Sequence, residues 1–339
     1  MEKIRVGING FGRIGRAFFR IAEGRDDIEV VSINDLGDVK NLAYLLAHDS
    51  VYKTAPFSVE ARERSLMVNG REVMVTAEKD PAVIPWGAQS VAVVVESTGV
   101  FTDFEKAAAH LTGGAKRVVI TAPVKGAGSD QNATVLVGVN EEKLPTTTVT
   151  SNASCTTNAS SPVIAILDEA VGIDKALLNT VHAYTATQAI VDGPTKKGFR
   201  EGRAAALNII PSSTGAAIAV TQAYESLAGK FDGISIRVPV PAGSIADITF
   251  IAKRDTSVEE INGILEKAAQ EPRWQGIFTV THEELVSSDI VGNPHAAIAD
   301  LSMTRVIGNL VKVLTWYDNE YGYASTLVRH VAGAGKHHA

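Results

Sequence analysis

A lone cysteine and a downstream histidine are the first residues whose types can do chemistry. Cys155 is the only cysteine and stands among small polar residues in the segment Ser151–Asn158, whereas a structural cysteine is ordinarily an inert apolar group. A predicted helix begins there, and N–H groups at a helix N-terminus lower the pKa of a thiol. His182 follows 27 residues later on a predicted strand. The two fit an activated nucleophile and its base, although eight histidines leave this choice open.

A second candidate site is the glycine-rich segment Gly10–Gly15, which fits the pattern G-x-G-x-x-G. It follows a predicted strand and opens a predicted helix, which is the context that dinucleotide binding requires. Gly10 permits a tight turn, Gly12 lets the backbone approach a pyrophosphate, and Gly15 lets helix and sheet pack closely. The helix N-terminus adds N–H groups for the phosphates.

An acidic residue and a small-residue loop extend this candidate site. Asp35 follows Gly15 by 20 residues, where a carboxylate holds the hydroxyls of the adenosine ribose. A carboxylate there repels the additional phosphate of NADP and so favours NAD; the alternative is a plain turn residue. Ser97, Thr98 and Gly99 follow a valine-rich strand and suit a loop beside the cofactor, although a simple turn fits equally well.

The elements around these segments divide the chain into two parts. Up to about residue 150, strands alternate with helices, which predicts an α/β domain with a doubly wound, Rossmann-type parallel sheet. Its strands are predicted at 4–8, 28–33, 72–76, 91–96, 117–120 and 134–137, and its helices at 16–22 and 104–111.

After residue 152, long apolar strands with few helices between them predict an α+β domain with a mainly antiparallel sheet. Its strands are predicted at 175–183, 233–240, 247–252 and 310–316, and its helices at 156–170, 258–270 and 322–332. Thr256 and Ser257 are candidate caps for the second of these helices, and Pro162 either lies in the first turn of a shorter first helix or kinks a longer one.

Composition excludes several classes of protein. The 339 residues carry a net charge of -6 and a pI near 5.8, which argues against nucleic-acid binding as the main role. One cysteine cannot form an intrachain disulfide, and the N-terminal segment lacks the apolar core of an export signal. No uncharged apolar stretch approaches the ~18 residues of a membrane span. We therefore expect a cytoplasmic protein without a membrane or metal site.

Several segments together resemble the phosphorylating, NAD-dependent glyceraldehyde-3-phosphate dehydrogenase family. The resemblance runs in order from Arg5 to about Tyr323. It is carried by Asn9–Arg16, Asn34–Leu36, Ser151–Asn158, His182–Thr185, 204–217, 237–239 and Trp316–Glu320. It implies an NAD-binding domain at 1–153, a catalytic domain at 154–318, a C-terminal helix at 319–339 that packs back on the NAD-binding domain, and a homotetramer.

The resemblance also implies a two-stage reaction. Cys155 matches the nucleophile that forms a thiohemiacetal with glyceraldehyde 3-phosphate, and His182 matches the base that takes the hydroxyl proton as hydride leaves for NAD. Inorganic phosphate then attacks the resulting thioester and releases an acyl phosphate. The backbone N–H of Cys155 is expected to help stabilise the oxyanion.

Further site residues follow from the resemblance alone. Phe11, Arg13 and Ile14 are expected at the pyrophosphate, Thr121 near the nicotinamide and Asn319 on its carboxamide. The pocket for the substrate's C3 phosphate is expected at Thr185 and Arg237, and the pocket for attacking phosphate at Ser154, Thr214 and Gly215, with Thr156 also on the substrate side. Taken alone, Arg237 fits an ion pair, Arg13 a solvated charge, and Thr214 or Asn319 a turn.

Departures from the family pattern leave two alternatives. Ile218 stands where lysine is common, Val240 where threonine is usual and Tyr321 where tryptophan is common. The loop at 191–203, with Arg200 and Arg203, has no assigned role. A sister enzyme, erythrose-4-phosphate dehydrogenase, would hydrolyse the thioester, but the intact Thr214–Gly215 segment favours phosphorolysis. A non-catalytic scaffold paralogue is the second alternative.

Overall fold

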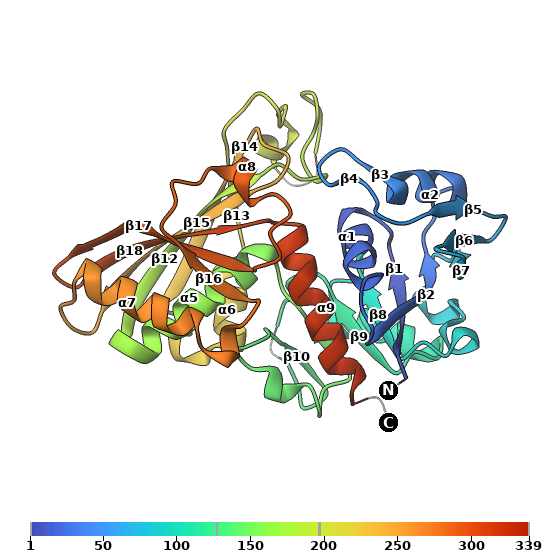
Figure 1. Ribbon diagram of the computed structural model, residues 1–339, viewed down its shortest axis with the longest axis horizontal. Helices are drawn as coiled ribbons and strands as arrows, with labels where there is room; N and C mark the ends of the chain where they lie inside the picture. Colours follow the sequence, from blue (N-terminus) through green and yellow to red (C-terminus); the bar gives the residue numbers. More distant parts are fainter. Residues whose placement is uncertain (1, 127, 196–197, 338–339) are drawn as a thin grey trace. The chain divides into compact units, whose positions relative to one another are not determined.

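The computed structural model describes residues 2–126, 128–195 and 198–337. By packing, the chain divides into two compact units, which are Met1–Ala153 with Ala324–Ala339 and Ser154–Tyr323. We call them the N-terminal unit and the central unit (Figure 1).

The N-terminal unit is built on a nine-stranded sheet in the order β10-β11-β9-β8-β1-β2-β7-β6-β5. All neighbouring strands are parallel except β5–β6 and β6–β7 at one edge. The strands are β1 (Ile4–Asn9), β2 (Ile28–Asn34), β5 (Val59–Ala61), β6 (Ser65–Val68), β7 (Arg71–Thr76), β8 (Val93–Glu96), β9 (Arg117–Ile120), β10 (Asn132–Thr134) and β11 (Val149–Ser151). A separate small hairpin joins β3 (His48–Asp49) and β4 (Lys53–Thr54).

The strand order reverses between β1 and β8, because β1 leads to β2 on one side and β8 leads to β9 on the other. Right-handed crossovers then place the connecting helices on opposite faces of the sheet. Ligands of such sheets bind where the order reverses, at the carboxyl ends of the strands. The helices are α1 (Arg13–Ala22), α2 (Val39–Ala47), α3 (Phe104–Ala107), α4 (Ala109–Thr112) and most of α9 (Tyr321–Gly335), with short 3-10 turns η1 (Pro81–Val83), η2 (Trp86–Gln89) and η3 (Glu141–Lys143).

The core of this unit explains why these residues form a parallel sheet. Val93, Val94 and Val95 on β8 are fully buried, as expected for a strand covered on both faces. Helix α1 buries Ala17, Phe18 and Phe19. Each fully buried valine or phenylalanine side chain contributes about 1.5–3 kcal/mol of hydrophobic stabilisation.

The central unit is built on a seven-stranded sheet in the order β13-β14-β12-β15-β18-β17-β16. Its pairs are antiparallel except β12–β14 and β16–β17. The strands are β12 (Ile173–Ala183), β13 (Ile210–Ser213), β14 (Phe231–Val238), β15 (Ser244–Ala252), β16 (Phe278–Thr281), β17 (Ala297–Ile307) and β18 (Leu310–Tyr317). The predicted fold class, a doubly wound domain plus an α+β domain with a mainly antiparallel sheet, is confirmed.

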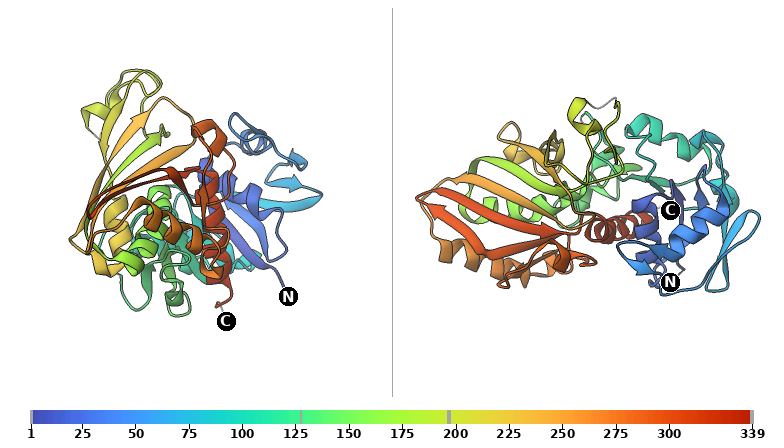
Figure 2. Two further views of the ribbon diagram at one scale, coloured as in Figure 1. Left: turned by 60° about the vertical axis from the view of Figure 1, so that its left-hand side comes forward. Right: turned by 90° about the horizontal axis from the view of Figure 1, so that it is seen from above.

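Three helices cover one face of the central sheet (Figure 2). On β15 every second residue is buried, because that face of the strand lies under the helices. Ser257 caps α7 by accepting the N–H of Glu260 at 3.2 Å, and Pro162 lies inside α5. The helices are α5 (Cys155–Val171), α6 (Ala216–Ala223), α7 (Val258–Ala269) and α8 (Ser287–Ile290), with η4 (Phe199–Gly202), η5 (Glu225–Leu227) and η6 (Pro272–Trp274).

Some elements differ from the sequence expectation. The helix expected at 104–111 is broken into α3 and α4, since the N–H of Leu111 bonds to Ala108 three residues back rather than four. The strand expected at 134–137 ends at Thr134. Strand β2 ends at Asn34, so Asp35 is the first residue after the strand. The sequence did not predict the helices and strands at 39–47, 59–68, 149–151, 210–223, 278–281 and 297–307.

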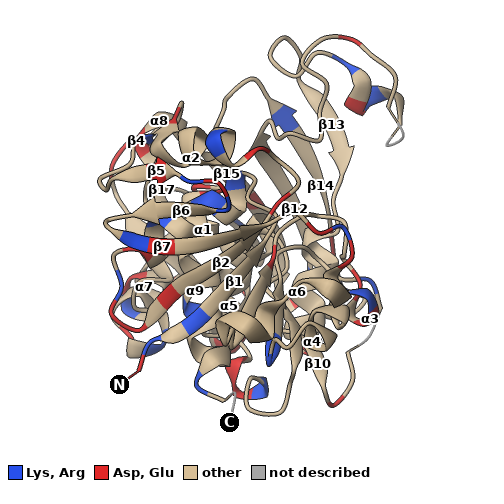
Figure 3. Ribbon diagram, turned by 90° about the vertical axis from the view of Figure 1, so that its right-hand side faces the viewer, with Lys and Arg blue, Asp and Glu red and all other residues tan. Residues whose placement is uncertain are grey.

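Charged residues of both signs are interspersed along the described chain (Figure 3). On β7, for example, Arg71 and Glu72 are adjacent, and Arg71 forms an ion pair of 2.6 Å with Glu23. Among the described residues, no helix has the length and apolar character needed to cross a membrane.

Candidate active site

The candidate nucleophile is the first residue of α5. Ser154 caps the helix, because its hydroxyl accepts the N–H of Thr157 at 3.1 Å. Ala153 has φ 53, in the left-handed region that a residue with a Cβ seldom adopts. The hydroxyl of Ser151 accepts the N–H of Ala153 at 3.0 Å. A sharp, locally bonded turn therefore delivers the chain from β11 to Cys155.

Cys155 and His182 are in contact within the central unit. The Cys155 Sγ lies 3.3 Å from His182 Nε2. On its other side, His182 Nδ1 lies 2.7 Å from its neighbour's carbonyl oxygen, Ala183 O, and 2.5 Å from Arg237 Nη1. His182 and Arg237 are register partners on the parallel strands β12 and β14, so their side chains leave the same face of the sheet.

Burial and the charge of Arg237 set the protonation of this pair. Burial raises the pKa of the Cys155 thiol, although Arg237 and hydrogen bonds at Thr156 oppose that rise. Burial and Arg237 together lower the pKa of His182 to about 3. The helix N-terminus alone was expected to lower the cysteine pKa, but desolvation outweighs it. At neutral pH the thiol therefore stands beside a neutral imidazole that is able to accept its proton.

A buried tyrosine that the sequence analysis did not single out completes this cluster. The Tyr317 hydroxyl lies 2.8 Å from Thr156 Oγ1 and 2.7 Å from Thr180 Oγ1. Its ring meets that of His182 edge-on, with 6.0 Å between centroids. Burial is the main cause that raises the pKa of Tyr317, so it stays a neutral phenol. Tyr317 thereby ties the residue after the cysteine to the histidine strand.

The N-termini of α5 and α6 lie close together in the central unit. Gly215 is the N-cap residue of α6, and Thr214 Oγ1 accepts the N–H of Ala216 at 3.2 Å. The hydroxyl of Thr157, in the first turn of α5, donates to the carbonyl of Ala216 at 3.2 Å. Because helix N-termini favour anions, the starts of α5 and α6 together suit a phosphate.

Buried polar atoms without a hydrogen-bond partner among the described residues include Arg237 Nε, Ser235 Oγ and Gln188 Nε2. Ser235 precedes Arg237 by two residues on β14 and shares its face, and Gln188 Oε1 accepts the N–H of Thr185 at 3.3 Å. Buried donors without partners are rare, and an arginine fork suits phosphate oxygens. Ser235 and Gln188 carried no sequence signal, since only strand register and loop packing bring them here.

The loop at 191–203 accepts a hydrogen bond from β13 and contains a surface ion pair. The Ser212 hydroxyl on β13 donates to Glu201 Oε1. Arg203 Nε lies 2.8 Å from Asp192 Oδ2, and both side chains are exposed. The part of this loop at residues 196 and 197 lies outside the described residues.

The glycine-rich segment of the N-terminal unit has the space that a pyrophosphate needs. Gly10 has φ +91, and a Cβ there would lie 2.7 Å from Thr98 N. A Cβ on Gly15 would lie 2.3 Å from the Gly10 carbonyl oxygen. A Cβ on Gly12 would meet nothing within 4 Å, and no side chain caps α1 at this N-cap residue. The open helix N-terminus and the bare approach at Gly12 fit the pyrophosphate of NAD.

Asp35 and its neighbours form a pocket at the end of β2. Asp35 Oδ2 accepts the N–H of Phe11 at 2.7 Å, and Oδ1 accepts the N–H of Gly37 at 2.8 Å. The pocket has a volume of about 360 Å³ and is lined by residues that include Gly10, Asp35 and Thr98. A ribose bound in this pocket would lie beside the Asp35 carboxylate, which the glycine-rich segment already holds in place.

The other expected cofactor residues have separate surroundings. The Arg13 side chain pairs with Asp49 and lies over the ring of Tyr52, 5.6 Å from its centroid. Ile14 lies in the first turn of α1, and Thr121 follows β9 with its N–H bonded to Glu96 O at 3.0 Å.

Asn319 belongs to the central unit. Its Oδ1 accepts the N–H of Gly243 and the hydroxyl of Ser244, each at 3.1 Å. The amide oxygen is thereby fixed toward β15, and the amide nitrogen is turned away from that strand.

Comparison with known proteins bears on both units. Residues 4–104 match the family model "Glyceraldehyde 3-phosphate dehydrogenase, NAD binding domain", and residues 154–319 match the corresponding C-terminal domain. The chain is 47% identical over 328 residues to glyceraldehyde-3-phosphate dehydrogenase 2 of Streptomyces arenae, covering 96% of each chain. It is also 47% identical over 341 residues to glyceraldehyde-3-phosphate dehydrogenase of Mycobacterium avium, covering 98% of this chain and 99% of that one.

Proposed function

The chain belongs to the glyceraldehyde-3-phosphate dehydrogenase family, and we propose that it oxidises and phosphorylates D-glyceraldehyde 3-phosphate to 1,3-bisphosphoglycerate with NAD. The observation that carries the proposal is the 3.3 Å contact between Cys155 Sγ and His182 Nε2 at the start of α5, with Arg237 beside it. This reaction needs a nucleophile, a base and a cationic group that binds phosphate, and the three residues supply them.

The first step is attack of the Cys155 sulfur on the aldehyde carbon. His182 Nε2 accepts the thiol proton, because it lies 3.3 Å from the sulfur and the ring is neutral at neutral pH. The carbonyl oxygen takes that proton from His182 and becomes the thiohemiacetal hydroxyl, which leaves the ring neutral again. The N–H of Cys155, at the helix N-terminus, stabilises the negative charge that develops on that oxygen.

His182 acts a second time when the thiohemiacetal is oxidised. NAD, when bound, would supply the acceptor for the hydride that the thiohemiacetal carbon loses as the thioester forms. His182 takes the hydroxyl proton in this step, and inorganic phosphate then attacks the thioester and frees the Cys155 sulfur. In this proposal NAD is held by Gly10, Phe11, Gly12, Arg13, Ile14, Asp35, Ser97, Thr98, Gly99, Thr121 and Asn319.

Two groups of residues hold the two phosphates. Arg237 and Thr185 bind the C3 phosphate of the substrate, which is supported by the partnerless donor on Arg237. Ser154, Thr214 and Gly215 bind the attacking phosphate, which is supported by the adjoining starts of α5 and α6. Thr156, held by Tyr317, borders the substrate at the cysteine.

The same features weigh against the alternatives. An enzyme that hydrolyses its thioester, such as an erythrose-4-phosphate dehydrogenase, has no need of the second anion site at Thr214 and Gly215. A non-catalytic scaffold has no need of a cysteine and a histidine held in contact. The named relatives are glyceraldehyde-3-phosphate dehydrogenases, which agrees with the main proposal.

We extend the proposal to assembly, location and domain limits. The family resemblance supports a homotetramer, which light scattering coupled to size-exclusion chromatography would test. The single cysteine, with no disulfide to form, supports action in the cytoplasm. The resemblance also supports an NAD-binding domain at 1–153 and a catalytic domain at 154–318, with 319–339 returning to the first.

The proposal is tested by NADH formation from glyceraldehyde 3-phosphate, with and without inorganic phosphate, before and after one equivalent of iodoacetamide. Because Cys155 is the only thiol, the label has one target. Phosphate-dependent activity that one equivalent of label abolishes supports the nucleophile and phosphorolysis together. Activity that ignores phosphate would favour the hydrolytic alternative, and no activity with either aldehyde would favour the scaffold.

A further inference from the structure

Four parallel strands of the N-terminal unit end in polar residues that lie side by side. Asn9 is the last residue of β1 and is the register partner of both Asn34, which ends β2, and Glu96, which ends β8. Asn34 is in turn the partner of Thr76, which ends β7. Asn9, Asn34 and Glu96 are buried, with Glu96 only 1% exposed. The row lies directly beneath the loops that form the predicted NAD site.

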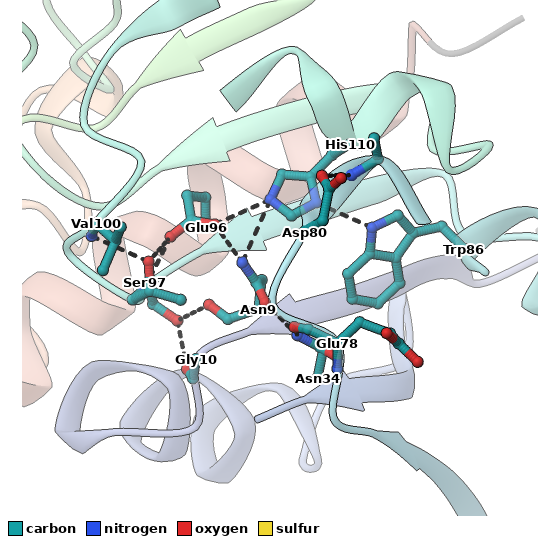
Figure 4. Close-up of polar contacts among 12 residues, drawn as sticks. Asn9, Gly10, Asn34, Glu78, Asp80, Trp86, Glu96, Ser97, Val100 and His110 are labelled. Carbon is teal, nitrogen blue, oxygen red and sulfur yellow. Dashed lines mark hydrogen bonds and ion pairs between the residues drawn. The ribbon is translucent and has the colours of Figure 1, made fainter. Parts of the chain in front are cut away.

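Hydrogen bonds run along this row toward Glu96 (Figure 4). The Thr76 hydroxyl donates to Asn34 Oδ1 at 2.8 Å, and Asn34 Nδ2 donates to Asn9 Oδ1 at 2.8 Å. Asn9 Nδ2 then donates to Glu96 Oε2 at 2.6 Å. The acceptor at Glu96 decides which way the Asn9 amide faces. The Asn34 amide is fixed by the Glu78 backbone, which donates to Asn34 Oδ1 at 2.8 Å and accepts from Nδ2 at 2.9 Å.

A histidine donates to the same carboxylate oxygen, and a tryptophan fixes which ring nitrogen of that histidine carries the proton. Trp86 Nε1 can only donate, and it lies 3.0 Å from His110 Nδ1. That nitrogen therefore accepts, and the imidazole proton is on Nε2, which lies 2.9 Å from Glu96 Oε2. Trp86 and His110 are fully buried, so bulk solvent does not reach either ring.

The other carboxylate oxygen holds the loop that borders the predicted cofactor site. Glu96 Oε1 accepts the N–H of Thr98 at 2.9 Å and also the Thr98 hydroxyl at 2.5 Å. Ser97 Oγ donates to the Gly10 carbonyl at 2.7 Å, and the Thr98 backbone packs so closely on Gly10 that a Cβ there would not fit. The place of Thr98 thus fixes the place of Gly10, the first glycine of the glycine-rich segment.

We propose that Glu96 is a positioning residue for NAD, because it is the common acceptor that aligns Asn9 and Thr98 and thereby presets the glycine-rich segment. This proposal rests on the proposed function, since it concerns the cofactor of that reaction. Glu96 need not touch NAD to act, because four donors converge on its two oxygens. Preorganisation of this kind changes the affinity for the ligand more than the rate of the chemical step.

The main test is Glu96→Gln, which keeps the shape of the side chain and replaces one acceptor oxygen with a donor. In either orientation the amide N–H groups face two other donors, either those of Thr98 or those of Asn9 and His110. We expect the Kd for NAD, measured by calorimetry without substrate, to rise at least tenfold. The KM for NAD should rise in parallel, while kcat at saturating NAD stays within about threefold.

Trp86→Phe, added to Glu96→Gln, supplies a readout that a merely structural role would not produce. Without the indole donor, His110 is free to carry its proton on Nδ1 and to accept at Nε2 from the amide N–H that Glu96→Gln introduces. The amide oxygen of the substituted side chain is then available to Thr98. The double variant should therefore bind NAD more tightly than Glu96→Gln alone, even though Trp86→Phe lowers thermal stability by loss of packing.

A matched control and a second variant keep the test decisive. Glu72→Gln makes the same change on β7, where the exposed carboxylate accepts one bond of 2.6 Å from Ser65, and it should leave the Kd unchanged. If Glu96→Gln does not fold, Asn9→Ala removes one of the donors to Glu96, and a Kd for NAD raised about threefold is expected.

An unchanged Kd in folded Glu96→Gln, or a lower kcat at saturating NAD with the Kd unchanged, would overturn the role of Glu96. A failure of the proposed function is distinguishable from this result. Wild-type protein that binds NAD but does not turn over glyceraldehyde 3-phosphate would overturn the reaction and leave the Kd comparison valid. Wild-type protein that binds no NAD would overturn both.

Discussion

Two buried polar clusters, one in each unit, differ in how completely their hydrogen bonds are satisfied. In the N-terminal unit, both oxygens of Glu96 are filled by Asn9, Thr98 and His110, and the ring nitrogens of His110 are both engaged. In the central unit, buried donors on Arg237 and Ser235 have no partner among the described residues.

This difference indicates two ways of preparing for a ligand. A saturated network holds the glycine-rich segment in one conformation before any nucleotide arrives, so little ordering remains to be done on binding. A partnerless buried donor is unfavourable by about 1–3 kcal/mol, and an anionic substrate that accepts from it regains that free energy. Changes in the first network should therefore alter affinity for NAD, and changes in the second should alter substrate binding and chemistry.

The largest expected effect is on the chemical step in the central unit. His182→Asn removes the base beside Cys155, so kcat should fall by about 10²–10⁴-fold, with the Kd for NAD nearly unchanged. Alkylation of Cys155 near neutral pH should also slow. Stopped-flow NADH formation and iodoacetamide kinetics across pH measure these two effects. The exposed His282 provides the control His282→Asn, and an unaltered alkylation profile in His182→Asn would show that the cysteine is activated in another way.

A smaller effect is expected at the phosphate-binding arginine. Arg237→Gln removes a charge-assisted contact to phosphate, so the KM for glyceraldehyde 3-phosphate should rise about 10–100-fold. The charge of Arg237 lowers the pKa of Cys155, so its loss should move the alkylation profile of Cys155 to higher pH. Steady-state kinetics and labelling rates test both. Arg254→Gln, at an exposed ion pair with Glu260, is the control, and a KM that changes equally in the two variants would contradict the assignment.

The next prediction concerns the NAD site of the N-terminal unit, where the variant is Asp35→Ala. The variant removes the predicted ribose contact and the bond to Phe11, so the Kd for NAD should rise about tenfold and use of NADP should become easier. The ratio of kcat/KM for the two nucleotides is the measurement. If that ratio does not change, Asp35 does not read the ribose.

The smallest effect concerns acid stability and compares one buried histidine from each unit. His330 on α9 lies 2.7 Å from Thr150 Oγ1 and 3.0 Å from Asn152 Oδ1, and burial lowers its pKa to about 3, as burial and Arg237 do for His182. The unfolded chain binds a proton at each site below about pH 6.5, whereas the folded chain does so only near pH 3. Stability should therefore be complete above pH 6.5 and fall as the pH drops toward 3.

His330→Gln tests this prediction. The slope of the unfolding free energy against pH between about 6 and 4 should decrease by about 1.4 kcal/mol per pH unit, because one fewer proton is taken up on unfolding. Urea unfolding at several pH values measures the slope. A slope equal to that of the wild type would show that His330 is already protonated in the folded chain.

Local sequence patterns predicted much of the fold for a physical reason. The valine run of β8 and the β-rich segment of β2 are buried on both faces, so burial imposes an apolar run that is legible without neighbours. Strand β17 and helix α6 escaped prediction. Strand β17 alternates buried with exposed residues irregularly around a register shift between Asp300 and Arg305, and α6 is an alanine-rich segment with little polar face.

The candidate site divides in the same way. Cys155, the glycine-rich segment and Asp35 were recognisable because each needs a particular residue type at a particular local position. The family is confirmed by the comparisons, while the individual roles of the site residues stay predictions until the variants are measured. The places of Tyr317 and Ser235 were not recognisable, since each is defined by contacts with distant strands.

The sequence by itself determined the class of chemistry, because a thiol in a polar helix start and a strand–glycine–helix unit are local patterns with local causes. Only the tertiary structure decided how close His182, named by the family resemblance, comes to Cys155, which charge lowers the pKa of His182, and which carboxylate aligns the glycine-rich segment. Those outcomes depend on strand register and burial, which bring together residues separated by tens of positions, and hydrogen bonds and charges act only across the distances that the fold creates.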